Sequence, residues 1–224
     1  MSRIVVITGT DTGVGKTVLT ALLARFLYTR GANVAALKPL CSGGREDARM
    51  LHRAIEGALS LDEINPWHFR APLAPLLAAR RERKLVTLRE VVAHVHSIAQ
   101  RFDTVLIEGA GGLLSPLGEH FSTRELITAL GAEVIIVGRN QLGVVNHIRL
   151  TLEALPPLIA GRSRVVLMSP KRPDAASRSN ARLLQQFLVE PRVCVLPVLR
   201  NVSGGESNPR VRRALAALLE RSIE

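Results

Sequence analysis

The sequence has few aromatic residues, few cysteines and no long apolar run, and each shortage excludes a class of protein. Aromatic residues make up 3% of the 224 residues although hydrophobic residues make up 47%, so the core is expected to consist of Leu, Val, Ile and Ala. Cys41 and Cys194 are too few for a disulfide framework. No apolar run approaches the ~20 residues of a membrane helix, and a predicted strand near the N-terminus leaves no room for a signal peptide. We therefore expect a cytoplasmic protein with one α/β domain, residues 1–224.

Acidic residues are also scarce relative to basic ones. The chain has 30 Lys and Arg against 19 Asp and Glu, which gives a net charge of +11. Such a balance raises the question of a nucleic-acid or membrane-surface partner. The basic residues are scattered, however, and almost no aromatic residues lie between them to stack on bases. The densest cluster, residues 80–84, is expected to be a solvated connection between helices. We therefore expect neither nucleic acid nor a membrane as a partner.

The most informative stretch is T-G-T-D-T-G-V-G-K-T, from Thr8 to Thr17. An apolar run, residues 4–7, precedes it and a helical pattern follows, and this order is the context of a phosphate-binding loop. Glycines let backbone N–H groups point at an anion, and the start of a helix adds further N–H groups and the positive end of its dipole. Lys16 is expected to reach the β- and γ-phosphates and Thr17 to hold Mg²⁺. The loop is a variant, because Thr10 stands where G-x-x-x-x-G-K-[ST] has its first glycine.

Six apolar runs of strand length alternate with segments of helix length. The runs are residues 4–7, 34–37, 104–107, 134–137, 164–168 and 193–196. The helical segments are residues 16–29, 47–57, 87–101, 123–130, 146–154, 176–189 and 208–220. Because the runs are continuously apolar rather than alternating, both faces of the sheet are expected to be covered. The pattern predicts a doubly wound α/β fold with a mostly parallel sheet and helices on both faces, and a packed loop over residues 66–75.

Polar residues that follow the strands are candidate site residues, because ligands of such sheets bind beyond the carboxyl ends of the strands. Lys38 leaves the second run, fixed by Pro39, and is expected to point its ammonium at the rim that carries the loop. Ser42 is a candidate donor to a substrate oxygen. Glu108 follows the third run, where a second Mg²⁺ contact is expected. Asp47 either stabilises the start of a helix or completes the metal site, and the residues alone leave both interpretations open.

The turn after the fourth run, residues 138–147, enters a predicted helix whose N–H groups are candidates for binding a carboxylate. His147 at its end is better explained as a core or surface histidine than as a functional one. His94 and His96 are two residues apart on a predicted helix and face different directions, which makes them a poor metal pair.

Four segments of the chain together resemble ATP-dependent dethiobiotin synthetases. They are residues 9–17, 38–43, 108–112 with Pro116 and Leu117 beyond, and 142–147. A threonine in place of the first glycine of the loop is itself typical of that family. The resemblance implies that CO₂ carboxylates 7,8-diaminononanoate to a carbamate, that the carbamate attacks the γ-phosphate of ATP, and that the second amine closes the ureido ring and releases phosphate. Such chemistry requires charge neutralisation and alignment more than covalent catalysis.

The resemblance implies roles for individual residues. Lys16 and Lys38 would stabilise the charge on the γ-phosphate and the carbamate, and Thr12 and Ser42 would touch the carbamate or the diamine. The ATP-binding residues would be Thr12, Gly13, Val14, Gly15, Lys16, Thr17, Asp47, Glu108, Gly109, Ala110 and Gly111, with Ser169, Pro197, Val198 and Leu199 near the base.

The resemblance also implies a metal ion and a second subunit. Mg²⁺ would be held by Thr17, Asp47 and Glu108. The site would lie at a homodimer interface, where the helix start at Val144, Val145 and Asn146 receives the carboxylate of the substrate from the other subunit.

The chain departs from the family pattern in three places. Gly13 stands where some members have an acidic residue, and the link from Ser42 to Asp47 is shorter than expected. Ser169 and Pro170 stand where an asparagine is expected to read adenine. A hydroxyl does not offer the donor and acceptor pair of an amide, so the sequence leaves the preferred base open.

Three other functions compete with this interpretation. A partition-type ATPase that acts on DNA or a membrane usually has a second lysine five residues before the main one, and this chain has Asp11 there. Amide-forming ligases of the same fold commonly carry a glutaminase domain, which is absent here. A degenerate nucleotide-binding module is disfavoured by the intact residues 15–17.

Overall fold

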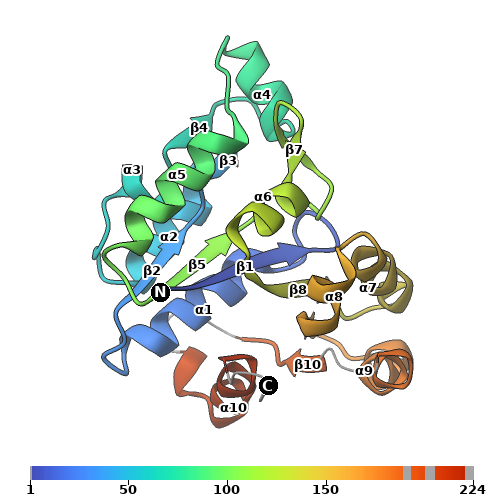
Figure 1. Ribbon diagram of the computed structural model, residues 1–224. Helices are drawn as coiled ribbons and strands as arrows, with labels where there is room; N and C mark the ends of the chain where they lie inside the picture. Colours follow the sequence, from blue (N-terminus) through green and yellow to red (C-terminus); the bar gives the residue numbers. More distant parts are fainter. Residues whose placement is uncertain (1, 189–192, 200–204, 220–224) are drawn as a thin grey trace.

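A six-stranded parallel sheet organises the fold (Figure 1). The computed structural model describes residues 2–188, 193–199 and 205–219. The strands and helices are β1 (Arg3–Gly9), α1 (Lys16–Tyr28), β2 (Val34–Leu37), β3 (Leu40–Ser42), α2 (Glu46–Ala54), α3 (Leu61–Ile64), β4 (Trp67–Phe69), α4 (Pro75–Arg81), α5 (Leu88–Ala99), β5 (Thr104–Glu108), β6 (Pro116–Gly118), β7 (Phe121–Ser122), α6 (Thr123–Leu130), β8 (Glu133–Arg139), α7 (Val144–Glu153), α8 (Pro157–Arg162), β9 (Arg164–Met168), α9 (Ala175–Phe187), β10 (Val193–Leu196), the 3₁₀ turn η1 (Gly205–Ser207) and α10 (Pro209–Leu219).

The strand order of the main sheet is β10-β9-β8-β1-β5-β2, and every neighbouring pair is parallel. All six predicted strands are confirmed, and they are the six strands of this sheet. β1 lies between β5 and β8, so the loop after β1 leaves the sheet between two strands that come much later in the chain. This topology brings residues that follow β1, β2 and β5 to one edge, as the doubly wound fold predicts.

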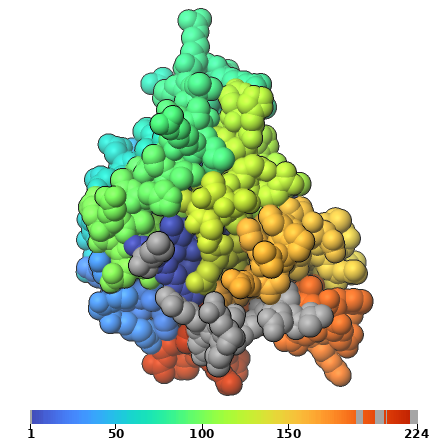
Figure 2. Space-filling model, in the orientation of Figure 1, coloured from blue at the N-terminus to red at the C-terminus, as the bar shows by residue number. Residues whose placement is uncertain are grey.

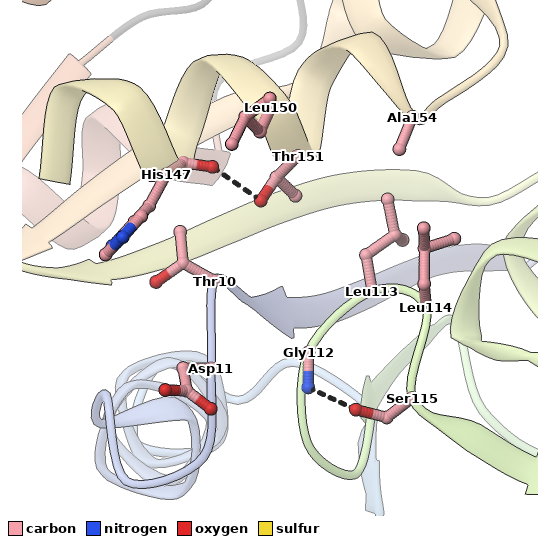
Figure 3. Close-up of a pocket in the computed structure, with 10 residues that line it drawn as sticks. All are labelled: Thr10, Asp11, Gly112, Leu113, Leu114, Ser115, His147, Leu150, Thr151 and Ala154. Carbon is pink, nitrogen blue, oxygen red and sulfur yellow. Dashed lines mark hydrogen bonds between the residues drawn. The ribbon is translucent and has the colours of Figure 1, made fainter.

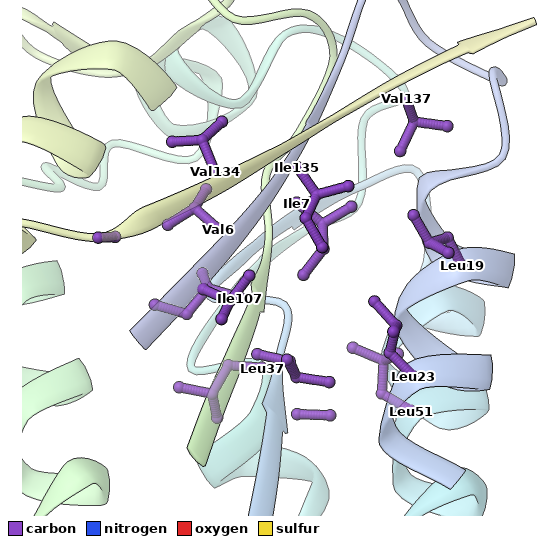
Figure 4. Packing of buried hydrophobic residues seen from close by; sticks show 14 of the residues in the cluster. Val6, Ile7, Leu19, Leu23, Leu37, Leu51, Ile107, Val134, Ile135 and Val137 are labelled. Carbon is purple, nitrogen blue, oxygen red and sulfur yellow. The ribbon is translucent and has the colours of Figure 1, made fainter. Parts of the chain in front are cut away.

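Helices cover both faces of the sheet, as the continuously apolar strands predict. Ile7 of β1 points toward Leu19 and Leu23 of α1, whereas Val6 lies on the opposite face (Figure 4). α1 and α10 lie on the first face, and α5 and α6 lie on the other (Figure 1). Ile7, Leu19 and Leu23 are fully buried, and each such side chain contributes about 1.5–3 kcal/mol to folding. The core is therefore divided between the two faces of the sheet.

Two kinds of helix start differ in how the first N–H groups are used. α5 and α6 begin with capping boxes, in which Thr87 pairs with Glu90 and Ser122 pairs with Glu125. α1 and α7 instead begin after the left-handed glycines Gly15 and Gly143, with no side-chain cap. The first N–H groups of α1 and α7 are therefore not used by a capping side chain and remain available for other partners.

Several short elements differ from the sequence prediction. The pairs β3–β4 and β6–β7 and the helices α3, α4 and α8 were not predicted. Arg80 and Arg81, expected in a connection between helices, are the last residues of α4. Trp67, expected in a packed loop, lies in β4, which pairs with β3. Short elements have too few residues to show a period, so they give little signal.

The ends of the last two predicted helices fall partly outside the described residues. Residue 189 of the predicted segment 176–189 and residue 220 of the segment 208–220 are not described. In the space-filling view, α4 and the β6–β7 hairpin form the narrow end of the molecule, opposite α10 (Figure 2). No helix in the described part of the chain is long and apolar enough to cross a membrane.

Candidate active site

The loop between β1 and α1 has the geometry of a phosphate-binding loop. Gly13 and Gly15 both have positive φ angles, 72° and 105°, a conformation in which L side chains are disfavoured. A Cβ atom at Gly15 would come within 3.0 Å of Met168. The ammonium of Lys16 folds back over the loop and donates to the carbonyl of Asp11 at 2.8 Å. Backbone amides and one cation thus surround the space where a phosphate group binds in such loops.

A buried cluster of charges joins this loop to the ends of β2 and β5. The ammonium of Lys38 lies 2.6 Å from Oε1 of Glu108 and 3.2 Å from Oδ2 of Asp47. The hydroxyl of Thr17 donates to the same Glu108 oxygen at 2.8 Å, and Lys38 also donates to the carbonyl of Gly109 at 3.1 Å. Lys38 is 4% exposed and Glu108 is 1% exposed. The phosphate-binding loop and the ends of β2 and β5 therefore meet at one place, as expected for residues that follow the strands of such a sheet.

Burial and neighbouring charges shift the pKa values of this cluster. Burial, together with the nearby ammonium of Lys38, lowers the pKa of Lys16 to about 8. Burial alone would also lower the pKa of Lys38, but the carboxylates of Glu108 and Asp47 outweigh it and raise the pKa. Burial raises the pKa of Glu108, and Lys38 opposes this shift. Lys38 is therefore held as a cation, whereas Lys16, which forms no ion pair with a carboxylate among the described residues, is more easily deprotonated.

The same cluster supplies ligands that suit a magnesium ion. Oε2 of Glu108 is buried and has no hydrogen-bond partner in the part of the chain that the structure describes, which is costly for a carboxylate oxygen unless a cation neutralises it. Thr17 and Asp47 add a hydroxyl and a second carboxylate. Mg²⁺ prefers such oxygen ligands and is usually held by one or two carboxylates plus phosphates. No group of three or more His, Cys, Asp or Glu residues within the described chain could hold a metal, and phosphate oxygens and waters usually supply the remaining ligands of Mg²⁺.

A cavity of about 900 Å³ opens onto this cluster. Most of the predicted site residues near the phosphates line it, namely Thr12, Gly13, Gly15, Lys16, Thr17, Lys38, Ser42, Asp47, Glu108, Ala110 and Gly111. Val14 and Gly109 are not among its lining residues: the side chain of Val14 is buried, and Gly109 contributes its carbonyl to Lys38. The placement of Asp47 in this cavity favours the metal-site interpretation over a role confined to the helix start.

Sequence reasoning missed one wall of this cavity. Residues 72–74, between β4 and α4, and Pro75, the first residue of α4, line it together with Cys41, Met50 and Ser115. The hydroxyl of Ser42 donates to the carbonyl of Leu73 at 2.6 Å, so Ser42 holds this segment as well as facing the cavity. Pro72, Leu73, Ala74 and Pro75 form no periodic pattern, and no signal in the sequence marks them as part of a site.

The residues predicted near the base lie at the same edge of the sheet but do not line the cavity. The N–H of Ser169 donates to the carbonyl of Leu196 at 3.0 Å, so Ser169 and Pro197 follow neighbouring strands. Val198 is exposed, and Leu199 packs near Gly205. Met168, directly before Ser169, contacts Gly15. The predicted base region is thus adjacent to the loop, and its role stays a prediction.

The predicted carboxylate site at the start of α7 is also separate from the main cavity. The side chain of Val144 is buried, and Val145 and Asn146 do not line the cavity. A second cavity, of about 480 Å³, lies beside α7 (Figure 3). Its walls are Thr10 and Asp11, the segment Gly112, Leu113, Leu114 and Ser115, and the α7 residues His147, Leu150, Thr151 and Ala154. His147, expected to be a core or surface residue, is exposed and lines this second cavity.

The fold and the main cavity together define a nucleotide-binding protein of the phosphate-binding-loop class. A central parallel sheet, a glycine-rich loop that enters α1, and a lysine, a threonine and a carboxylate at its mouth are the recurring parts of that class.

Comparison with known proteins identifies the family within that class. Residues 3–206 match a family model described as an AAA domain. The chain is 36% identical over 205 residues to the ATP-dependent dethiobiotin synthetase BioD of Bacillus subtilis (strain 168), with 88% of each chain covered. It is 46% identical over 153 residues to the protein of the same name from Anaeromyxobacter sp. (strain Fw109-5), with 66% of this chain and 69% of that relative covered. The chain therefore belongs to the ATP-dependent dethiobiotin synthetase family of biotin biosynthesis, and it is an ATP-dependent ligase that forms carbon–nitrogen bonds.

Two solved structures with low sequence identity show the same fold. The MinD cell division protein of Aquifex aeolicus is 16% identical with a TM-score of 0.59, and the match covers 100% of this chain and 99% of that one. The ParA protein of pNOB8, solved bound to nonspecific DNA, is 12% identical with a TM-score of 0.59, over 97% of this chain and 96% of that one. At such identities the likeness shows the fold alone.

Proposed function

We propose that this protein forms the ureido ring of dethiobiotin from 7,8-diaminononanoate, CO₂ and ATP with Mg²⁺. One observation carries the proposal: Lys16, Thr17, Lys38, Asp47 and Glu108, from four segments of the chain, line one cavity. That set matches a reaction in which a carbamate attacks the γ-phosphate of ATP, because both partners are anions and must be brought together. Family membership supports the same assignment.

The triphosphate of ATP is held by the backbone amides of the loop and the start of α1. Thr17, Glu108 and Asp47 hold Mg²⁺, and the unpartnered Oε2 of Glu108 supports this placement. When bound, the ion neutralises charge on the β- and γ-phosphates. The base of the nucleotide lies near Ser169 and residues 197–199, where backbone groups rather than an amide side chain select it.

The two lysines have different tasks in the proposed reaction. Lys16 moves from the carbonyl of Asp11 to the γ-phosphate once a nucleotide enters, because a phosphate is the stronger acceptor. Lys38, which is kept charged by Glu108 and Asp47, stabilises the charge on the carbamate and on the phosphoryl group as it transfers. Thr12 and Ser42, which both line the cavity, contact the carbamate or the diamine.

A homodimer completes the proposed site. The start of α7 at Val144, Val145 and Asn146 offers N–H groups, with Gly143 as a left-handed N-cap, but it does not line the main cavity of its own chain. The apolar residues Leu114 and Leu150, 55% and 60% exposed, lie beside the second cavity. A partner subunit that covers them would bring its own α7 to the substrate carboxylate. Size-exclusion chromatography with light scattering tests this part, and a monomer at working concentrations would contradict it.

Phosphate release tests the proposed reaction. Purified protein is incubated with ATP, Mg²⁺, diaminononanoate and bicarbonate, and each component is omitted in turn. We expect release that requires both the diamine and bicarbonate, with dethiobiotin detected by mass spectrometry. Matched reactions replace the diamine by double-stranded DNA or by anionic vesicles. Hydrolysis that responds to DNA or vesicles and ignores the diamine would favour the partition-type ATPase instead.

A further inference from the structure

Arg139, the last residue of β8, makes a contact that the proposed reaction does not explain. Its Nη2 atom donates to the carbonyl oxygen of Gly13 at 2.8 Å, across 126 residues of sequence. A Cβ atom at Gly13 would lie 3.7 Å from the same Nη2. The guanidinium therefore sits directly against the phosphate-binding loop, at a residue that lines the main cavity.

This contact fixes the orientation of one peptide group of the loop. In a trans peptide, the carbonyl oxygen and the following N–H point in opposite directions. When Arg139 holds the Gly13 carbonyl, the N–H of Val14 is therefore directed away from Arg139. Gly13 has a φ of 72°, and a glycine rotates more easily than any other residue. A restraint on this peptide consequently matters more than it would at a stiffer position.

Arg139 is well placed to restrain the loop because its own backbone is anchored. The N–H of Thr10 donates to the carbonyl of Val137 at 2.9 Å, so β8 also supports the first turn of the loop. The next residue, Asn140, is 1% exposed, and its side chain donates to the carbonyl of Ser177 and accepts from Asn180. Its N–H donates to the carbonyl of Met168. β8 therefore contacts the loop at two points, Thr10 and Gly13.

The charge of Arg139 remains available to a ligand. The contact with Gly13 goes to an uncharged carbonyl, and the side chain is exposed. Lys38, in contrast, is paired with two carboxylates. A guanidinium at the rim of the loop attracts a polyphosphate electrostatically, and dissolved salt screens this attraction.

We propose that Arg139 is a positioning residue for nucleotide binding, which sets the Gly13–Val14 peptide before the nucleotide arrives and attracts its phosphates. The inference rests on the proposed function, since it requires that the loop binds a nucleoside polyphosphate. It predicts a loss of nucleotide affinity with little change in the rate of the bound complex, because the guanidinium acts on the loop and not on the carbamate.

Equilibrium titration with a fluorescent ADP analogue and Mg²⁺ tests the inference in the full chain. We expect Arg139→Ala to raise the Kd about tenfold, the effect of losing a charged hydrogen bond. Arg139→Lys keeps the charge and one donor, so its Kd should fall between those of the wild type and Arg139→Ala. The Kd of Arg139→Ala should also depend less on salt. The control is Arg89→Ala, which removes an equal charge from an exposed position on α5 and should leave the Kd unchanged.

Steady-state kinetics separate positioning from general damage to the fold. In Arg139→Ala the KM for ATP should rise about as much as the Kd, while kcat at saturating ATP stays close to that of the wild type. If this variant does not fold, Arg139→Lys carries the test. Equal Kd values and equal salt dependence for Arg139→Ala and the wild type would overturn the inference alone. A wild-type protein that binds no nucleotide would overturn the proposed function as well.

Discussion

Lys38 and Glu108 form a buried ion pair, 2.6 Å long, between the ends of two adjacent strands, β2 and β5. The register pairs Leu37 with Ile107, so Lys38, which follows β2, and Glu108, the last residue of β5, come next on the two aligned strands. Neither side chain is exposed by more than a few per cent. A buried pair of this kind is weak support for stability, because desolvation of both charges offsets their attraction. Its position beside the phosphate-binding loop indicates a functional role.

Replacement of Lys38 should separate binding from turnover. Lys38→Ala keeps the loop amides and Lys16, so nucleotide affinity should change little. The charge on the carbamate and the transferring phosphoryl group loses its main cation, so kcat should fall about 100-fold or more. Nucleotide titration and phosphate release measured side by side check this expectation. Normal turnover in the variant would exclude Lys38 from the reaction.

The same substitution should also destabilise the metal-free protein, and a double variant separates the two effects. Without Lys38 the buried carboxylate of Glu108 is unpaired, which should lower the free energy of unfolding by about 3–5 kcal/mol. In Lys38→Met combined with Glu108→Gln no buried charge is left unpaired, so stability should recover while turnover stays lost. Urea unfolding curves measure the recovery. A double variant as unstable as Lys38→Ala would contradict this account of the pair.

Replacement of Glu108 should weaken the response to magnesium. Glu108→Gln preserves the shape of the side chain and an oxygen for Lys38, but it removes the negative charge at Oε2 that a metal would neutralise. We expect the Mg²⁺ concentration at half-maximal rate to rise about tenfold. Glu119→Gln is the matched control. Glu119 lies in the turn between β6 and β7, outside the main cavity, and pairs with Arg80 of α4. An unchanged magnesium titration would remove Glu108 from the metal site.

Replacement of Gly15 should affect both the fold and nucleotide binding. Gly15→Ala places a Cβ at a φ of 105°, within 3.0 Å of Met168. Gly31→Ala is a control with a similar conformation, a φ of 75°, but with open space around it. We expect Gly31→Ala to cost about 1 kcal/mol of stability through backbone strain alone. Gly15→Ala should cost more and should also raise the Kd for nucleotide, whereas Gly31→Ala should not.

The predictions from sequence succeeded where a residue follows a long periodic element. Lys38 and Glu108 could be placed because apolar strands fix where the chain emerges and parallel strands end at a common edge. The sequence left the place of Asp47 open, because Asp47 lies in the first turn of a helix and does not follow a strand. The family resemblance then supplied the roles. The wall formed by residues 72–75 could not be placed, because its position depends on β4 and α4, which are too short to give a pattern.

The contact between Arg139 and Gly13 illustrates a different limit. The sequence places Arg139 near the end of a strand and Gly13 in the loop that follows another, but several polar residues, Arg139, Asn140 and Gln141, cluster at that strand end. Which of them turns toward the loop depends on side-chain packing, here the burial of Asn140 against α9, which leaves Arg139 on the exposed side. Local sequence does not encode that choice.

A cluster of charges at the amino ends of the strands, away from the site, should determine part of the stability of the protein in acid. Glu133 accepts hydrogen bonds from Arg3 and Arg164 at 2.7–2.8 Å. Burial alone would raise the pKa of Glu133, but the two arginines outweigh it and hold the pKa below the ordinary 4.5. Above that ordinary value both the folded and unfolded states are ionised, so the stabilisation is fully present. As the pH falls, the unfolded chain takes up the proton first, and the stabilisation is lost by the time the pH passes the folded pKa.

Glu133→Gln tests this pH dependence. At pH 7 the variant should be less stable than the wild type by about 1–2 kcal/mol, a value reduced by the partial exposure of the carboxylate. As the pH falls below about 4.5, toward and past the lowered pKa of Glu133 in the folded state, the wild type should lose this advantage, so the two free energies of unfolding should converge. Urea unfolding at a series of pH values measures both, with Glu153→Gln on the exposed side of α7 as control. If the difference in the free energy of unfolding between the wild type and Glu133→Gln stays constant from pH 7 to 3, the charge of Glu133 does not cause the stabilisation by Arg3 and Arg164.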